Sequence, residues 1–312
     1  MSRSADRPFR FAVDAPDPLP GRSWLDTARE VEALGYSTLF CPDHLDDGVA
    51  PIAAMSAAAA VTTTLNVGSL VLACDYRHPA VVGRELTMID QISGGRVEVG
   101  LGAGWKSADY RQSGMPMERP GVRVSRMIEH ATILRRLFTE PSVTFHGEHY
   151  RVDELVCSPG PVSAAGPKFL IGGGAPRVLR FAGGFADIVG VNPSIHSGTI
   201  DAAAAQDAHP DRVDEKFGWV GEGAGERLGD LEFNVWLAAA DITDDRAGAA
   251  EFMSAAFGVE PAAALESPML LVGTVEQVID DLLRRRERWG YSYITIPVGV
   301  ARAFAPVVEA LA

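Results

Sequence analysis

The stretch LNVGSLVLACDYRHPAVVGRELTMIDQISGGRVEVGLGAGW, residues 65–105, decides the fold of this chain. Its first part, residues 65–72, is mostly apolar on both faces, which is typical of a strand in a parallel sheet covered by helices. A helix is expected to begin at Pro79, because proline suits the first helical position, and to run to about Ile92. A glycine turn then leads into a second strand over residues 96–102. The stretch therefore predicts one strand–helix–strand unit of an α/β protein.

The same alternation of strand and helix recurs along the whole chain. Strands are expected at residues 9–14, 37–41, 65–72, 96–102, 168–172, 186–191, 231–240 and 292–298. A right-handed series of eight such units closes naturally into a (β/α)8 barrel, whose active site lies at the carboxyl ends of the strands. The rival fold, a doubly wound open sheet, would normally carry GxGxxG in its first strand–helix turn, and none follows the first strand. We therefore predict an α/β fold class with a single TIM barrel domain over residues 1–312.

Three connections are longer than normal loops, at residues 107–121, 140–167 and 192–210. The first and the third follow strands and are expected on the active face, where the third could act as a lid. The second follows a helix and belongs to the opposite face, and its sequence VTFHGEHYRV predicts a hairpin. We interpret His146 and His149 as surface residues, since neither has a partner at metal-ligand spacing.

The charge and the composition exclude several classes of function. Lys and Arg total 28 against 41 Asp and Glu, and the net charge of −13 argues against binding to a nucleic-acid backbone. No apolar run approaches the ~18 residues that span a bilayer, and the amino-terminal stretch lacks the apolar core of a signal peptide. The three cysteines show no CxxC spacing, which fits a reducing compartment without structural zinc. We expect a cytoplasmic protein with a small-molecule substrate, no metal, and no nucleic-acid or membrane partner.

Asp43 and His44 follow the second predicted strand, at the rim where a barrel carries its active site. An adjacent carboxylate and imidazole can position and transfer a proton near neutral pH, with Asp43 supporting His44 by a hydrogen bond or by fixing the turn. The same Pro-Asp-His sequence can also form a plain turn in which the histidine caps a helix. The residues alone leave both interpretations open.

A glycine-rich segment follows the fifth predicted strand. Gly172, Gly173 and Gly174 are followed by Ala175 and by a helix that begins at Pro176. Successive backbone N–H groups at a helix N-terminus favour an anion, which predicts a phosphate site. A tight barrel turn needs fewer than three glycines, so we prefer the phosphate interpretation.

A second segment, GLGAGW at residues 100–105, ends the fourth predicted strand. Its small residues would let a flat ligand approach the backbone, and the indole of Trp105 could wall a ring-shaped pocket. Equally, the glycines could relieve crowding inside the barrel while Trp105 packs under the next connection. With both interpretations open, we include Gly104 and Trp105 among the candidate cofactor-binding residues, together with Asn192 after the sixth strand.

Several stretches together resemble the bacterial luciferase-like monooxygenase superfamily over almost the whole chain. They are LFCPDHL (39–45), residues 65–105, VTFHGEHYRV (143–152), FLIGGGAPRVLRFAGGFADIVGV (169–191), LLVGTVEQVIDDL (270–282) and GYSYITIPV (290–298). The resemblance implies a (β/α)8 barrel that binds either FMN or the deazaflavin coenzyme F420. Compact single-barrel members with this pattern are more similar to the F420 branch.

The resemblance also implies roles for individual residues. Asp43 and His44 would lie beside the reactive carbon of the cofactor ring. A bulge at Ser69, Leu70 and Val71, with a non-prolyl cis bond between Leu70 and Val71, would support the ring from behind. The glycine loop after the fifth strand would hold the cofactor phosphate.

One departure from the family pattern bears on the substrate. Sugar-phosphate dehydrogenases of this family place a glutamate acid just after the strand-four glycines, where this chain has Trp105. A sugar 6-phosphate is therefore not expected as the substrate, and the acid for any reduction must be His44, the substrate or water. We expect hydride transfer between F420 and a small organic substrate, carried out by a homodimer. The alternatives are an FMN-dependent monooxygenase, which would need a flavin reductase partner, and a catalytically silent cofactor carrier.

Overall fold

The computed structural model describes residues 7–195, 198, 199 and 201–312. Its central sheet runs in the order β3-β2-β1-β13-β10-β9-β8-β5-β4, all parallel, and pairing of β3 with β5 closes the ring. The strands are β1 (Arg10–Asp14), β2 (Thr38–Cys41), β3 (Asn66–Ser69), β4 (Leu72–Ala73), β5 (Val97–Gly102), β8 (Lys168–Gly173), β9 (Ile188–Val191), β10 (Glu232–Trp236) and β13 (Tyr291–Pro297). The predicted (β/α)8 barrel is confirmed.

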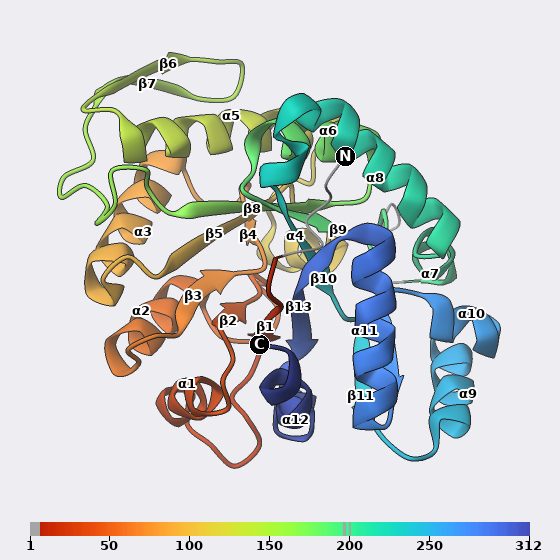
Figure 1. The fold of residues 1–312 in the computed structure, drawn as a ribbon. Coiled ribbons are helices and arrows are strands. Elements are labelled where there is room, and N and C mark those ends of the chain that lie inside the picture. Colours follow the sequence, from red (N-terminus) through yellow and green to blue (C-terminus); the bar gives the residue numbers. More distant parts are fainter. Residues whose placement is uncertain (1–6, 196–197, 200) are drawn as a thin grey trace.

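Helices surround the barrel on its outside (Figure 1). The outer ring consists of α1 (Trp24–Ala33), α2 (Pro51–Val61), α3 (Pro79–Ser93), α5 (Pro120–Thr139), α6 (Pro176–Phe185), α8 (Pro210–Ala224), α11 (Val275–Trp289) and α12 (Ala301–Leu311). Their ends follow local sequence signals. For example, α11 begins with a capping box between Thr274 and Gln277 and ends at Gly290, whose φ of 77° is left-handed.

Two predicted strands are divided in the structure. The third breaks after Ser69 and resumes as the two-residue β4, so the barrel sheet has nine segments in place of eight. The seventh, predicted over residues 231–240, is wrong in its second half. After β10 the backbone N–H of Leu237 still donates to Thr295, but that of Ala238 donates to Met269, so the chain leaves the barrel sheet there.

The chain that leaves the barrel forms a small unit that the sequence did not predict. Its strands β11 (Ala239–Ile242) and β12 (Leu270–Gly273) pair in parallel. Between them lie α9 (Arg246–Phe257) and α10 (Pro261–Glu266), which pack on this pair at the edge of the barrel (Figure 1). The unit has its own small core of Met253, Ala264, Leu270 and Val272.

The three long connections carry secondary structure. The first contains α4 (Ser107–Ser113), and the third contains α7 (Ala202–Asp207), while residues 196, 197 and 200 lie outside the described part of the chain. The second carries the predicted hairpin, β6 (Val143–His146) with β7 (Arg151–Leu155), beyond α5 (Figure 1).

The outcome for the two hairpin histidines differs. His146 is exposed, as predicted. His149 is half-buried with its Nε2 enclosed, so its prediction as a surface residue is wrong, because the hairpin folds back onto Glu129 of α5. Within the described part of the chain, no helix is long and apolar enough to cross a membrane.

An ion cluster fills the amino-terminal end of the barrel. Arg10 binds Glu232 through two hydrogen bonds of 2.7 Å and Glu98 through one of 2.5 Å, and its guanidinium lies 3.4 Å from the ring centre of Tyr293. Above this layer, small and aromatic side chains such as Ala12 and Phe40 form an apolar layer. A ligand can therefore enter only at the carboxyl ends of the strands.

Candidate active site

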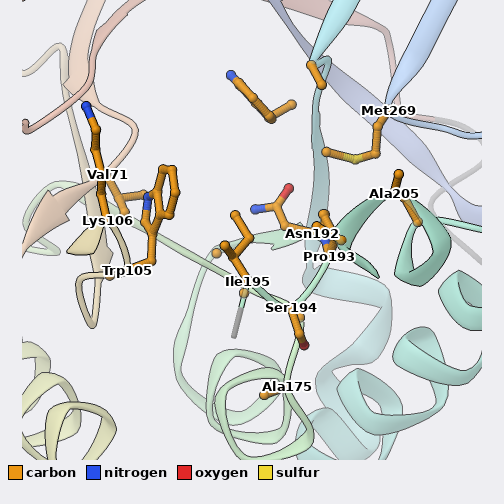
Figure 2. Close-up of a pocket in the computed structure, with 18 of the residues that line it drawn as sticks. Val71, Trp105, Lys106, Ala175, Asn192, Pro193, Ser194, Ile195, Ala205 and Met269 are labelled. Atoms are coloured by element: carbon orange, nitrogen blue, oxygen red, sulfur yellow. The ribbon is translucent and has the colours of Figure 1, made fainter. Parts of the chain in front are cut away.

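A cavity of about 890 Å³ opens at the carboxyl ends of the barrel strands. Figure 2 shows Val71 and Trp105 on one side of it and Met269 and Ala205 on the other, with Asn192 between them. All but one of the predicted site residues line this cavity, namely Asp43, His44, Leu70, Val71, Gly104, Trp105, Gly172, Gly173, Gly174, Ala175 and Asn192.

The exception is Ser69, in the bulge between β3 and β4. Its side chain is buried, and its hydroxyl donates to the carbonyl oxygen of Cys41 at 2.7 Å, which ties the bulge to β2. The next peptide bond, Leu70–Val71, is cis, as predicted. The side chains of Leu70 and Val71 therefore reach the cavity while Ser69 holds the bulge in place.

The glycines of β5 make room for this bulge. A Cβ on Gly100 would overlap the carbonyl oxygen of Ser69, and a Cβ on Gly102 would lie 2.5 Å from Cγ2 of Val71. Close packing against the bulge therefore explains why residues 100 and 102 are glycines, which agrees with the second interpretation of residues 100–105. Trp105 lines the cavity.

A carboxylate that the sequence did not indicate holds His44. The Nδ1 atom of His44 lies 2.9 Å from Oδ2 of Asp109 in α4, and Asp109 also accepts from the backbone N–H of Leu45 and the hydroxyl of Tyr76, both at 3.0 Å. Burial alone would raise the pKa of Asp109, but these hydrogen bonds outweigh it and hold the pKa below its usual value. An ionised carboxylate only accepts, so Nδ1 carries the proton and Nε2 of His44 is left to exchange one. The ring of Trp105 stands edge-on to that of His44, with centres 5.7 Å apart.

Asp43 turns away from His44, so of the two kinds of support expected, the hydrogen bond between them is not formed. Its two oxygens bind Arg77 at 2.6 and 3.1 Å, and one also accepts from the backbone N–H of Ala73 at 3.0 Å. Adjacent residues at the end of a strand point to opposite sides, which separates the two side chains. Asp43 thus fixes the wall formed by β4, and Asp109 is the partner of His44.

The glycine run after β8 leads into an uncapped helix. The N-cap of α6, Ala175, makes no side-chain capping bond, and the backbone N–H groups of Gly174 and Ala175 have no hydrogen-bond partner among the described residues. Packing also demands small residues here, since a Cβ on Gly173 would lie 2.6 Å from Cγ1 of Val178. Backbone donors at a helix N-terminus that faces a cavity suit a phosphate.

A cation that the sequence did not indicate lies at the same cavity. Arg123 of α5 lines the cavity and is largely buried. Its Nη1 donates to the carbonyl oxygen of Gly104 at 2.5 Å, and its Nε is buried without a partner. A guanidinium with a spare N–H is a strong donor for a phosphate oxygen.

One further acid of the cavity was missed by sequence reasoning. Asp14 ends β1, and its Oδ2 accepts a hydrogen bond from Nε1 of Trp236 at 2.8 Å, while its Oδ1 is buried without a partner. Burial raises the pKa of Asp14 to about 7, although the bond from Trp236 acts the other way. At neutral pH this carboxyl group therefore keeps its proton part of the time, unlike an ordinary aspartate.

Within the described residues, one group has the composition of a cation site. The ligand atoms of His44, Asp46 and Asp109 lie within 4.8 Å of one another. Protein donors already bind these oxygens, since Nζ of Lys106 lies 2.5 Å from Asp46 and Asp109 accepts three hydrogen bonds. We therefore assign no metal to this group.

Fold and site together define a parallel (β/α)8 barrel with a histidine–carboxylate pair and phosphate-type donors around one cavity. The model of the family described as luciferase-like monooxygenase matches residues 8–220, and the chain belongs to this family.

Relatives with assigned activities use two different cofactors. The chain is 31% identical over 176 residues to an F420-dependent glucose-6-phosphate dehydrogenase of Intrasporangium calvum, covering 53% of this chain and 52% of that protein. It is 30% identical over 206 residues to the enzyme of that name in Nakamurella multipartita, covering 62% and 60%. It is also 31% identical over 121 residues to an FMNH2-dependent dimethylsulfone monooxygenase of Pseudomonas putida, covering 39% and 33%. The chain thus matches between a third and three fifths of the length of these relatives.

Solved structures with the same fold cover nearly the whole chain. An F420-dependent tetrahydromethanopterin reductase of Methanopyrus kandleri superposes with a TM-score of 0.73 at 16% identity, covering 97% of this chain and 96% of that one. An F420-dependent secondary alcohol dehydrogenase also gives a TM-score of 0.73, at 18% identity, covering 96% and 99%. At these identities the likeness shows the fold.

Proposed function

We propose that this chain is an F420-dependent oxidoreductase that transfers a hydride between the deazaflavin and a small organic substrate. The observation that carries the proposal is that one cavity joins a proton-exchanging pair, His44 and Asp109, to phosphate-type donors at Gly174, Ala175 and Arg123. Similarity to F420-dependent dehydrogenases supports this choice of cofactor. When bound, F420 supplies a ring carbon that gives or takes a hydride and reacts slowly with oxygen.

The cavity residues fit a ring cofactor that carries a phosphate. The volume of about 890 Å³ lies near the upper end of the ~300–1,000 Å³ common for ligand sites, which suits a cofactor together with a small substrate. Two polar atoms buried in its wall, Nε of Arg123 and Oδ1 of Asn192, have no hydrogen-bond partner among the described residues and would bind polar groups of the cofactor. Val71, after the cis bond, and Trp105 would flank the ring (Figure 2).

His44 would exchange the proton that accompanies hydride transfer. Asp109 holds Nδ1 of the imidazole, fixes the ring orientation and stabilises the positive charge that forms when Nε2 takes a proton. The ring of Trp105 packs edge-on against the imidazole and would help to fix its orientation. The pair of Asp43 and Arg77 keeps the wall beside His44 in place and takes no direct part in the transfer.

Oxygen dependence tests the proposal against its rival. We expect the purified chain to oxidise reduced F420 in the presence of a panel of neutral carbonyl compounds, at the same rate in air and under nitrogen. The rival, an FMN-dependent monooxygenase, draws support from the dimethylsulfone monooxygenase and would require both oxygen and a flavin reductase. Turnover that requires oxygen and FMN would overturn the proposal.

We further propose that the chain works as a cytoplasmic homodimer. Isologous pairing about a twofold axis is the commonest oligomer, and the cysteines are sparse. Sedimentation should then give twice the chain mass of 33.2 kDa at micromolar concentration, whereas a single species at the chain mass would contradict the dimer.

A further inference from the structure

The cavity has an apolar arm on the side opposite Trp105. Six apolar residues define it, Ala205, Trp236, Ala238, Val259, Met269 and Leu270. Polar side chains beside them in the chain also line the cavity, namely Gln206, His209, Ser254, Glu260 and Ser267. The six apolar residues come from α7, the end of β10 and the unit around β12, which lie together at one edge of the barrel (Figure 1). Figure 2 shows the side chains of Met269 and Ala205 on this side of the cavity.

The arm offers no Lys or Arg side chain to an anionic ligand. In the described part of the chain, the only Lys and Arg that line the cavity are Lys106 and Arg123. Lys106 lies beside Trp105 (Figure 2) and is paired with Asp46, and Arg123 binds the carbonyl oxygen of Gly104. A phosphate or carboxylate in the arm would therefore lose its hydration without gaining a counter-charge, which is costly.

Asp14 lies beside the arm, and among the described residues its carboxyl group lacks a full set of partners. Trp236 belongs to the arm and donates to Oδ2 of Asp14, while Oδ1 of Asp14 is buried and unpartnered. Buried polar atoms nearly always have a partner, so this oxygen marks a position for a polar atom of a ligand. Two residues of the neighbouring strands lie next to Asp14, Cys41 of β2 and Pro297 of β13. Burial raises the pKa of the Cys41 thiol, and proline has no charge. Neither residue therefore stabilises the ionised form of Asp14, which can keep a proton to donate.

We propose that the apolar arm binds a neutral, largely apolar substrate, and that the single polar atom of this substrate, a carbonyl-type oxygen, accepts a hydrogen bond from Asp14. This inference rests on the proposed function in one respect, namely that it calls the bound molecule a substrate. Binding in the arm itself requires neither F420 nor turnover.

Equilibrium binding of defined probes tests the class of ligand. The full chain is titrated calorimetrically with 2-butanone, 2-hexanone and 2-octanone, and with octanoate and glucose 6-phosphate, each with and without F420. Each methylene that enters the arm should tighten ketone binding by about fourfold, as expected for the transfer of one CH₂ group from water. With F420 occupying the phosphate donors, octanoate and glucose 6-phosphate should bind at least about tenfold more weakly than 2-octanone. Affinity that does not depend on chain length, or stronger binding of glucose 6-phosphate, would overturn the proposal.

Paired variants locate the binding in the arm. Met269→Gln places an amide in the arm and should abolish most of the gain with chain length, whereas Met269→Leu keeps an apolar side chain of similar volume and should retain it. Asp14→Leu should weaken 2-octanone binding about tenfold, and Asp14→Asn, which keeps a donor, should restore most of it. The affinity of the wild-type chain should also fall between pH 6 and 8, and that of Asp14→Asn should not. If Gln and Leu at position 269 behave alike, or Asp14→Leu binds like wild type, the assignment of the arm is wrong.

The outcomes separate this inference from the proposed function. Ketone binding with the predicted chain-length dependence but without F420 binding would refute the proposed cofactor and leave the arm assignment standing. F420 binding without ketone binding would refute the arm assignment alone.

Discussion

Asp109→Asn should remove the proton-exchanging ability of His44 while leaving its position almost unchanged. The two side chains have the same shape, and the amide oxygen can still accept from the backbone N–H of Leu45, now 3.0 Å from the carboxylate. The amide nitrogen would then face Nδ1 of His44, which accepts a hydrogen bond only when it carries no proton. The proton moves to Nε2, the atom that must accept one during the reaction, so the imidazole adopts the wrong tautomer.

The expected loss of rate follows from this tautomer change. Loss of a general acid or base costs about 10²–10⁴ in rate, and the same exchange of aspartate for asparagine beside a catalytic histidine costs about 10⁴ in serine proteases. We expect kcat to fall by about 10³. The Kd for F420 should change less than about threefold, since Asp109 is almost fully buried and its carboxylate oxygens are already bound to His44, Leu45 and Tyr76.

Two measurements check this prediction, and one needs no substrate. Long-range proton–nitrogen NMR on protein labelled at histidine reports which ring nitrogen is protonated, and His44→Gln assigns the signal among the seven histidines. We expect the proton on Nδ1 in the wild type and on Nε2 in Asp109→Asn. Stopped-flow oxidation of bound reduced F420 by 2-octanone gives the rate. A variant with the wild-type tautomer, or with the wild-type rate, would refute the assigned role of Asp109.

The remaining predictions concern the phosphate donors and two buried acids. Arg123→Leu and Gly173→Val should each weaken F420 binding about 10–100-fold in titrations. Neither change should affect binding of a deazaflavin ring that lacks the phosphate. If both ligands lose the same affinity, the phosphate binds elsewhere. Asp43→Ala should lower the free energy of unfolding by about 3–5 kcal/mol in urea, because it strands Arg77, whereas Asp46→Ala, in a less buried pair, should cost about 1 kcal/mol or less. Burial raises the folded-state pKa of Asp14 to about 7, so the native chain keeps a proton that the unfolded chain releases from about pH 4. The unfolding free energy of the wild type relative to Asp14→Asn should therefore fall by up to about 4 kcal/mol as the pH rises from 4 to 7, and a constant difference would contradict the raised pKa.

The barrel could be predicted from the sequence because its signals are local. Proline at the start of α3 and glycine after α11 mark helix ends, and apolar runs mark parallel strands, whatever the rest of the chain does. The division of residues 231–240 could not be predicted in this way. It depends on the hydrogen bond from Ala238 to Met269, a partner that is distant in the sequence and directly precedes β12, a strand outside the barrel.

In the candidate site too, local sequence patterns indicate some residues, whereas only the folded chain brings the others into place. The alternation of strands and helices predicts that His44 and Gly174 lie at the carboxyl ends of strands. Both residues line the cavity. The partner of His44 does not follow from it, because Asp109 reaches the imidazole only through the packing of α4, 65 residues further along the chain. Arg123 and Asp14 were missed for a similar reason, since an unpartnered buried atom is a property of the folded molecule alone.

Competitive titration with the two candidate cofactors tests the central claim most directly. The purified full chain is titrated with F420 and with FMN in the same buffer, with tryptophan fluorescence as the signal, and then with each cofactor in the presence of the other. The account predicts saturable binding of F420 at one site per chain, at least about tenfold tighter than FMN, and displacement of bound FMN by F420. Tighter binding of FMN, or no binding of F420, would contradict it.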